Sequence, residues 1–201
     1  MKMETKTLKG EQKSHELLEK GMEVLWSKGY NATSVNDIVK AAGVPKGSFY
    51  FYFDSKEDFA VKAIDTYFHL NYFPAKEILD DLSNSPKQRL LNFYEFRCAV
   101  IKNELECKMG CLACNLGNEM AEHSEKIREA IVAKEEIIRN EIAAVVLEAQ
   151  QKGEIDSSME PMDIVAFFED AGKGAMTTMK ELKSAYPVDN YMSMLRKFMF
   201  S

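Results

Sequence analysis

The chain has 201 residues, of which 46% are hydrophobic and 29% charged, enough apolar material for one large or two modest buried cores. No segment is long and apolar enough to cross a membrane and no signal peptide precedes the first polar helix, so we expect a cytoplasmic protein without a membrane partner. The net charge of −6 comes from the residues beyond 60, because residues 1–60 hold nine lysines and nine acidic residues; this neutral part can still present a basic face to DNA.

Two short helices joined by a tight turn follow the first predicted helix, which covers residues 11–28. Ser34 can cap the first of the two, because its hydroxyl accepts a hydrogen bond from an unpaired backbone N–H. The apolar residues that follow at helical spacing are Val35, Ile38, Val39 and Ala42. Gly43 suits the end of this helix, and Pro45 suits the first turn of the next one.

The second of these short helices carries a compact group of side chains suited to DNA. The group consists of Lys46, Gly47, Ser48, Tyr50 and Tyr52. An α-helix fits the major groove, and a helix-turn-helix places its second helix there. An ordinary helical hairpin would explain the turn but not the clustered phosphate-binding side chains, so we favour a three-helix helix-turn-helix domain.

The remainder of the chain predicts six further helices, and no strand pattern, repeat or low-complexity tract. The expected helices are one that begins near Ser55 and is broken or kinked at Pro74, then Gln88–Glu106, Cys111–Glu122, Glu125–Gln151, Met159–Ser184 and Val188–Phe200. The expected interruptions are Ser83–Pro86, Gly110, Gly153 and Pro187. We therefore expect an all-α fold, with a helix-turn-helix domain over residues 1–54 and a helical regulatory and dimerisation domain over residues 55–201.

The last two predicted helices each have an apolar face. The first face comprises Ile164, Phe167, Phe168, Ala171, Ala175, Thr178, Met179 and Leu182, and the second comprises Tyr191, Met194, Leu195, Phe198 and Met199. Gly172 and Gly174 would let another helix approach closely. These faces either pack only within the monomer or pair with a second copy; we favour pairing, because a monomer with so short a recognition helix would bind DNA too weakly.

Residues 11–68 resemble the DNA-binding domain of the TetR family of bacterial transcriptional repressors. The resemblance is carried by Gly29-Tyr30, Ser34, Ile38, Ala42-Gly43-Val44, Gly47, Phe49-Tyr50, Phe53 and Lys56. The family often has histidine where this chain has Tyr52, which keeps a hydrogen-bonding group there. The resemblance implies that the side chains or backbone of Lys46, Gly47 and Tyr50 approach bases, and that phosphates are positioned by Ser34, Ser48, Tyr52 and Lys56.

The same resemblance implies the partners of the protein. Members of the family pair through their last two helices in a four-helix bundle, so that two recognition helices meet a palindromic operator with half-sites about one helical turn or more apart. We therefore expect a homodimeric repressor that leaves double-stranded DNA when its C-terminal domain binds a small molecule or is modified. A shift of the fourth helix, which joins the two domains, would change the separation of the recognition helices.

Four cysteines cluster within seventeen consecutive residues, and they are Cys98, Cys107, Cys111 and Cys114. The segment GCLACNLGNEMAEHSEKIREAI resembles the branch of the family related to the N-ethylmaleimide-responsive repressor, whose matching Gly-Cys-Leu cysteine senses electrophiles and oxidants. The matching residue is Cys111, which follows a helix-starting glycine, where the helix dipole favours the thiolate. Cys107 or Cys114 could resolve a sulfenic acid as a disulfide. The alternative is that all four are small buried hydrophobic residues.

Relatives in this branch place a basic residue from a later helix near the sensing thiol. Lys173 and Lys180 are the candidates in this chain. The twelve methionines also favour a pocket that accepts varied apolar ligands, because methionine side chains adapt their shape. The candidate lining residues are Phe93, Met120 and Phe167, with Tyr94, Phe96, Met109 and Met176, although each could equally belong to the core.

Other chemistries have weaker support in the sequence. Cys107, Cys111, Cys114 and His123 could supply four metal ligands, but they lack the paired spacing of a zinc module, so we expect no metal or cofactor. No glycine-rich phosphate loop or local nucleophile motif is present, so we expect no enzyme. The alternative function is a helical thiol-redox or metal-binding protein whose N-terminal motif is incidental.

Overall fold

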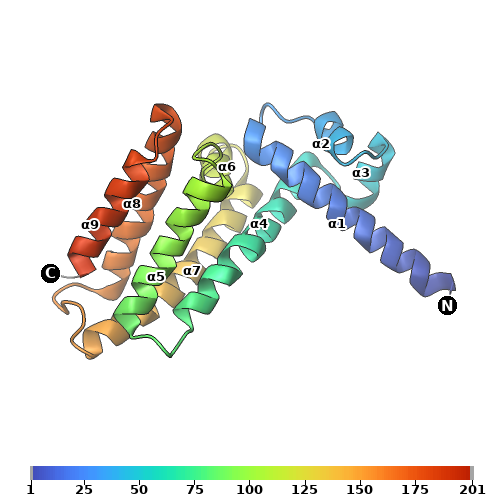
Figure 1. Ribbon diagram of the computed structural model, residues 1–201. Coiled ribbons are helices and arrows are strands. Elements are labelled where there is room, and N and C mark those ends of the chain that lie inside the picture. The colour runs from blue at the N-terminus through green and yellow to red at the C-terminus, as the bar shows by residue number, and fades with distance from the viewer. Residues whose placement is uncertain (1, 200–201) are drawn as a thin grey trace. The chain divides into compact units, whose positions relative to one another are not determined.

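The computed structural model describes residues 2–199, except for the side chains of residues 2–11 and Glu104, and this part of the chain is all-α (Figure 1). Its helices are α1 (Lys2–Lys28), α2 (Val35–Ala41), α3 (Lys46–Tyr52), α4 (Lys56–Leu79), α5 (Pro86–Ala99), α6 (Leu112–Met120), α7 (Glu125–Gln151), α8 (Pro161–Leu182) and α9 (Tyr186–Met199), with a π-helical turn, η1, over Val100–Glu104. The all-α prediction is confirmed. Within the described residues, no helix is long and apolar enough to span a membrane.

The helices form two compact units. The first unit comprises the chain up to His69 together with Leu112–Val132, and the second comprises Leu70–Cys111 together with the chain from Ala133 onward. The first unit therefore contains α1 to α3, α6 and the beginnings of α4 and α7, whereas α5, α8 and α9 belong to the second. The expected boundary between a DNA-binding and a regulatory domain, after residue 54, does not coincide with the boundary between these two units. That functional boundary stays a prediction.

Local sequence signals determine where the short helices begin and end. The Ser34 hydroxyl accepts a hydrogen bond from the Asp37 N–H (3.2 Å), and the Asp37 carboxylate accepts one from the Ser34 N–H (2.9 Å), which completes a capping box at the start of α2. Gly43 follows α2 with a φ of 65°, a left-handed conformation that glycine adopts without strain. α3 begins directly after Pro45.

Four prolines of the described residues lie inside helices, and two of them, Pro86 and Pro187, do so contrary to the sequence-based expectation. Pro86 and Pro187 are predicted to separate helices, but they occupy the first turns of α5 and α9, where a missing N–H removes no helical hydrogen bond. Pro74 does not break α4, which continues to Leu79. Pro74 deprives the Leu70 carbonyl of its helical partner; both residues are exposed, so water can reach that carbonyl.

The helix predicted over Gln88–Glu106 does not continue to its expected end. α5 ends at Ala99, η1 follows, and Glu106 and Cys107 then have left-handed backbones, with φ of 47° and 58°. Residues other than glycine rarely adopt this conformation, which places backbone strain directly after the π-turn. The Cys107 N–H reaches back to the Ile101 carbonyl (3.1 Å).

The remaining predicted helices agree with the structure more closely. α7 matches its prediction at both ends, whereas α1 begins at Lys2 rather than at residue 11. α6 and α8 are each shorter than expected by a few residues. Phe200, the predicted end of the last helix, lies outside the described residues.

An aromatic cluster lies at the centre of the first unit. Phe49 and Phe53 of α3 and Phe59 of α4 are almost completely buried, and their ring centroids are between 5.0 and 5.7 Å apart. α1 contributes Trp26, whose ring meets that of Tyr67 edge-to-face at 5.0 Å. These contacts hold α3 in place, because a helix of seven residues is unstable by itself.

In the second unit α5 and α8 lie beside α9 (Figure 1). The buried residues of these helices include Leu90, Phe93, Ile164, Phe168 and Leu195. Two of the ion pairs between helices of this unit involve arginines of α5: Arg89 with Glu148, and Arg97 with Glu169 (2.7 Å). Pairing keeps these partly or fully buried guanidinium groups from being uncompensated charges in a largely apolar interior.

The apolar faces predicted on α8 and α9 divide into a buried and an exposed part. The buried part includes Phe168, Met179 and Leu195. The exposed part includes Phe167, Leu182 and Met194, which are 68%, 60% and 50% exposed. Large apolar side chains exposed on neighbouring helices are typical of a surface that meets another protein.

Gly21 of α1 is packed too closely to accept a side chain. A Cβ atom there would lie 2.6 Å from both Cγ2 of Ile38 and Cζ of Phe59, which are fully buried. We expect Gly21→Ala to lower the free energy of unfolding by about 1–3 kcal/mol, measured by urea denaturation. Gly117→Ala is the control, because its Cβ would lie 3.8 Å from the nearest atom of Ile131; it should be neutral or stabilise by up to about 1 kcal/mol. A neutral Gly21→Ala would contradict this packing.

Candidate nucleic-acid interface

The outward face of α3 is fixed by two buried phenylalanines. Phe49 and Phe53 are four residues apart and are 0% and 2% exposed, so both face the interior. Lys46, Gly47 and Tyr50 are exposed. A Cβ atom on Gly47 would have no neighbour within 4 Å. α3 therefore presents a short, unobstructed surface to solvent.

The polar side chains predicted on α3 differ in exposure. Tyr50 is 56% exposed, and its ring lies edge-to-face on that of Phe49 at 5.3 Å. Tyr52 is half-buried, with its ring 4.9 Å from the ring of Phe51. Ser48 is also half-buried, near the start of the helix. On α3, the predicted base-contacting residues are thus more exposed than the predicted phosphate-contacting ones, whereas Ser34 before α2 is exposed as well.

The start of α2 is held by a network around Asp37. The Ser34 hydroxyl donates to the Asp37 carboxylate (2.5 Å), and Lys28 of α1 forms an ion pair with it (2.9 Å). These groups, the Ser34 hydroxyl first and Lys28 second, hold the pKa of Asp37 well below its usual range. Asp37 is therefore ionised at physiological pH, and α2 is tied to the end of α1.

Lys56 is predicted to position phosphates, and in the structure its ammonium group faces the loop between α1 and α2. Nζ donates to the carbonyl oxygens of Tyr30 and Thr33, both at 2.9 Å, and lies 4.1 Å from the centroid of the Tyr30 ring. Burial lowers the pKa of Lys56, and the negative charge of Glu119 opposes this shift. Lys56 thus holds the backbone directly before Ser34, and one ammonium N–H remains for another acceptor.

α6 and the turn after it contact the loop before α2 and the start of α4. The carboxylate of Glu119 accepts a hydrogen bond from the Asn31 N–H (2.9 Å), and it lies so close to Gly29 that a Cβ there would be 2.0 Å from Oε1. The Ser124 hydroxyl donates to Glu57 at the start of α4 (2.6 Å). No sequence signal predicts these contacts, because their partners are 88 and 67 residues apart.

Cys111, the predicted sensing thiol, directly precedes the first residue of α6 and is partly exposed. The four cysteines form no disulfide. Gly110 packs against Lys180, because a Cβ on this glycine would lie 3.2 Å from Cδ of the lysine. Lys173, the other candidate for a basic neighbour, instead pairs with Glu135 (2.7 Å). The geometry therefore favours Lys180 as the basic residue near Cys111.

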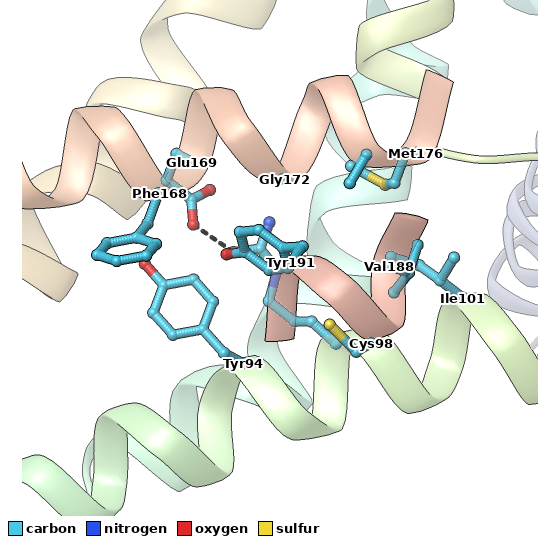
Figure 2. Close-up of a pocket in the computed structure, with 11 residues that line it drawn as sticks. Tyr94, Cys98, Ile101, Phe168, Glu169, Gly172, Met176, Val188 and Tyr191 are labelled. Atoms are coloured by element: carbon cyan, nitrogen blue, oxygen red, sulfur yellow. Dashed lines mark hydrogen bonds and ion pairs between the residues drawn. The ribbon is translucent and has the colours of Figure 1, made fainter. Parts of the chain in front are cut away.

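A pocket of about 30 Å³ lies among α5, α8 and α9 of the second unit (Figure 2). Tyr94, Glu169 and Tyr191 reach into it from these three helices, and Arg97 pairs with Glu169 (2.7 Å). Burial first, and the charge of Glu169 second, raise the pKa of both tyrosines, so their phenols stay protonated. The charges of Arg97 and Glu169 cancel at the wall of the pocket. In this conformation the pocket has room for roughly one or two water molecules.

The predicted lining residues are only partly brought together here. Tyr94 and Met176 line the pocket. Phe93 is buried in the second unit but does not line it, Phe167 is exposed on α8, and Met120 belongs to the core of the first unit. The sequence analysis missed the ion pair at its wall; a charged residue inside the apolar stretch FRCAV was the signal that could have revealed it.

Cys98 lines the same pocket and is buried. Burial raises the pKa of this thiol to about 11, and the positive charge of Arg97 offsets the effect only in part. The thiol is therefore protonated near neutral pH and is a poor nucleophile. Among the side chains that the structure describes, no three histidine, cysteine or acidic groups are arranged to hold a metal ion.

Two family models match the chain. One, for bacterial regulatory proteins of the tetR family, matches residues 17–63, and the other, for the tetracyclin repressor-like C-terminal domain, matches residues 86–195. The chain is 31% identical to the HTH-type transcriptional repressor DhaR of Mycobacterium sp. (strain GP1), over 89% of this chain and 88% of the relative. It is 30% identical to the HTH-type transcriptional repressor NemR of Escherichia coli (strain K12), over 57% of each chain.

Solved structures show the same fold. A regulatory protein TetR from Rhodobacter sphaeroides superposes with a TM-score of 0.84 at 30% identity, covering 92% of this chain and 97% of that one. The reduced form of E. coli NemR superposes with a TM-score of 0.80 at 23% identity, covering 92% and 96%. These relatives are transcriptional regulators, a class of protein that is not enzymatic.

The raised pKa of Cys98 predicts how its reactivity depends on pH. In a variant that keeps only Cys98, alkylation by iodoacetamide should be slow at pH 7 and should accelerate about tenfold per pH unit up to pH 9, because the thiolate is the nucleophile. The rate can be followed by mass spectrometry of the adduct. A rate that levels off below pH 9 would show that the thiol has a lower pKa than its burial implies.

Proposed function

The chain belongs to the TetR family of bacterial regulatory proteins, and we propose that it is a homodimeric repressor that leaves a palindromic operator when its C-terminal domain is modified or occupied. Members of this family bind DNA operators as dimers and respond to small-molecule ligands. The observation that carries the proposal is the exposed seven-residue α3, held by buried Phe49 and Phe53 within the matched residues 17–63. We place its action in the cytoplasm, where the operator lies, and propose no enzymatic activity.

The proposed DNA contacts come from α3 and its neighbours. Lys46, Gly47 and Tyr50 are exposed on α3 and are suited to approach base edges in the major groove. Ser34, Ser48 and Tyr52 are proposed to bind phosphates. Lys56 would support the same contacts in two ways: its remaining N–H can reach a phosphate, and its bonds to two loop carbonyls hold the start of α2.

The proposed dimer interface is the exposed part of α8 and α9. Phe167, Leu182 and Met194 would be buried against the same residues of a second copy, which removes apolar surface from water. Gly174 supports a close approach of two helices, because a Cβ there would meet nothing within 4 Å. Residues 55–201 would then act as the regulatory and dimerisation domain, and residues 1–54 as the DNA-binding domain.

Cys111 is the proposed sensing thiol. Its place directly before α6 favours the thiolate, because the N-terminal end of a helix carries partial positive charge, and Lys180 beside Gly110 adds to that potential. Cys107 and Cys114 are the proposed partners that resolve a sulfenic acid as a disulfide.

α6 offers a path from this thiol to the DNA-binding residues. Modification of Cys111 would displace the start of α6, and Glu119 of that helix holds the Asn31 N–H in the loop before Ser34. The loss of this hydrogen bond would release the capped start of α2. A packed element with two arrangements is the usual way in which such a signal crosses a protein.

A noncovalent inducer is the second candidate for the signal. The pocket lined by Tyr94, Glu169 and Tyr191 supports it, because protonated phenols and a carboxylate can orient a small polar molecule. Met176 at its wall can adapt to different shapes, and the pocket would have to widen to admit a ligand.

The proposed DNA contacts can be tested with lysine variants. Lys46→Ala should weaken operator binding, reduce discrimination against unrelated DNA, and lower the slope of log K against log salt by about one for each subunit of the bound dimer. Lys56→Ala should weaken binding to all sequences alike and lower the slope by the same amount. Fluorescence anisotropy titrations at several salt concentrations measure these effects, with Lys152→Ala, an exposed lysine of the second unit, as control. If both variants bind like the parent, the assignment is wrong.

The proposed sensor can be tested with single-cysteine changes. N-ethylmaleimide should release the parent protein from DNA, whereas Cys111→Ser should still bind the operator but resist release. Cys98→Ser is the matched control and should be released like the parent, because the buried thiol is not a nucleophile at neutral pH. Gel-shift assays with mass spectrometry of the adduct measure both outcomes. Release of Cys111→Ser as readily as the parent would favour the noncovalent inducer.

A further inference from the structure

Among the side chains of the first unit that the structure describes, Phe51 is the most exposed large apolar one. It is 80% exposed, whereas the two other phenylalanines of the same segment, Phe49 and Phe53, are 0% and 2% exposed. A phenylalanine in water contributes little to the folding of the monomer, and this one lies next to Tyr50, which is 56% exposed, so two large rings face solvent on the same short helix. Neither the predicted base contacts nor the predicted phosphate contacts include it.

The position of Phe51 on α3 places it among the proposed base-contacting residues. Gly47 lies four residues earlier, so the two share one face of the helix, and Tyr50 is adjacent. Helical side chains lean toward the N-terminus of their helix, which is where Gly47 leaves open space. The ring also contacts that of Tyr52 edge-to-face at 4.9 Å, which restricts its orientation.

The chemistry of the ring selects its target on DNA. A phenyl group forms no conventional hydrogen bond with a phosphate or a polar base edge. The apolar group that base edges present in the major groove is the C5-methyl of thymine. Lys46 on the same helix is exposed and supplies the positive charge that draws the phosphates near.

We propose that Phe51 is a specificity-determining residue that packs on a thymine methyl group in each operator half-site. The proposal rests on the proposed function, because it requires α3 to enter the major groove. Removal of one methyl-sized group from an apolar contact weakens binding roughly fourfold, so loss at both half-sites of a dimer should weaken it roughly fifteenfold. An apolar contact releases no counterions, so this loss should leave the salt slope unchanged.

The test removes the methyl group from the DNA and the ring from the protein separately. An operator is first selected by the parent protein from a random-sequence duplex library. It is then synthesised with deoxyuridine, which lacks only the methyl group, in place of thymine at one symmetric pair of positions at a time. Anisotropy titrations compare the parent, Phe51→Ala and Leu82→Ala, the last of which removes an equally exposed apolar side chain (80%) from a loop of the second unit.

The expected result is one thymine position at which deoxyuridine weakens the parent and Leu82→Ala roughly fifteenfold but leaves Phe51→Ala unaffected. Thermal unfolding should show Phe51→Ala as stable as the parent, since the side chain is exposed. The proposal is wrong if deoxyuridine weakens the parent at no position, an outcome that the scan of the parent decides by itself, or if it weakens Phe51→Ala as much as the parent at the sensitive position. A parent that enriches no sequence from the library would instead overturn the proposed function itself.

Discussion

The structure depends on the anchoring of a helix that is too short to be stable by itself. α3 has seven residues, and it keeps its position because Phe49 and Phe53 pack against Phe59 of α4. Close-packed aromatic rings transmit displacement rather than absorb it, because little free volume separates them. The orientation of the proposed DNA-binding face therefore follows the beginning of α4 more than the hydrogen bonds of α3. The proposed DNA-binding face therefore has a defined orientation, and a displacement of the start of α4 would change that orientation.

The loop before α2 is held by charged groups that belong to other helices. Lys56 of α4 donates to two of its carbonyls, and Glu119 of α6 accepts its Asn31 N–H. Hydrogen bonds with one charged partner are stronger than neutral ones, so few are needed to hold this loop. One of the two clamps lies on the helix that directly follows Cys111. The first unit thus joins the helix-turn-helix motif and α6 within one compact body.

Local signals predicted most helices and the exposed surface of α3, because caps, turn glycines and apolar repeats act over a few residues. Ser34, Gly43 and Pro45 illustrate this, and α7 was correct at both ends. Pro86 and Pro187, predicted to separate helices, lie in the first turns of α5 and α9, where a proline removes no helical hydrogen bond. The strained turn after η1, the pocket ion pair and the Glu119 clamp could not be predicted, since each depends on how distant segments pack.

The single tryptophan of the chain gives the molecule an internal optical label. Trp26 is buried in the first unit, where its ring meets Tyr67 of α4. The fluorescence of an indole depends on the polarity of its surroundings and on neighbouring aromatic rings. A change in its emission wavelength or intensity therefore reports on the α1–α4 contact without any attached dye. The four thiols lie between residues 98 and 114 of the sequence, whereas the indole belongs to α1. Chemical labelling of the thiols and spectroscopy of the indole can therefore be carried out on the same unaltered protein.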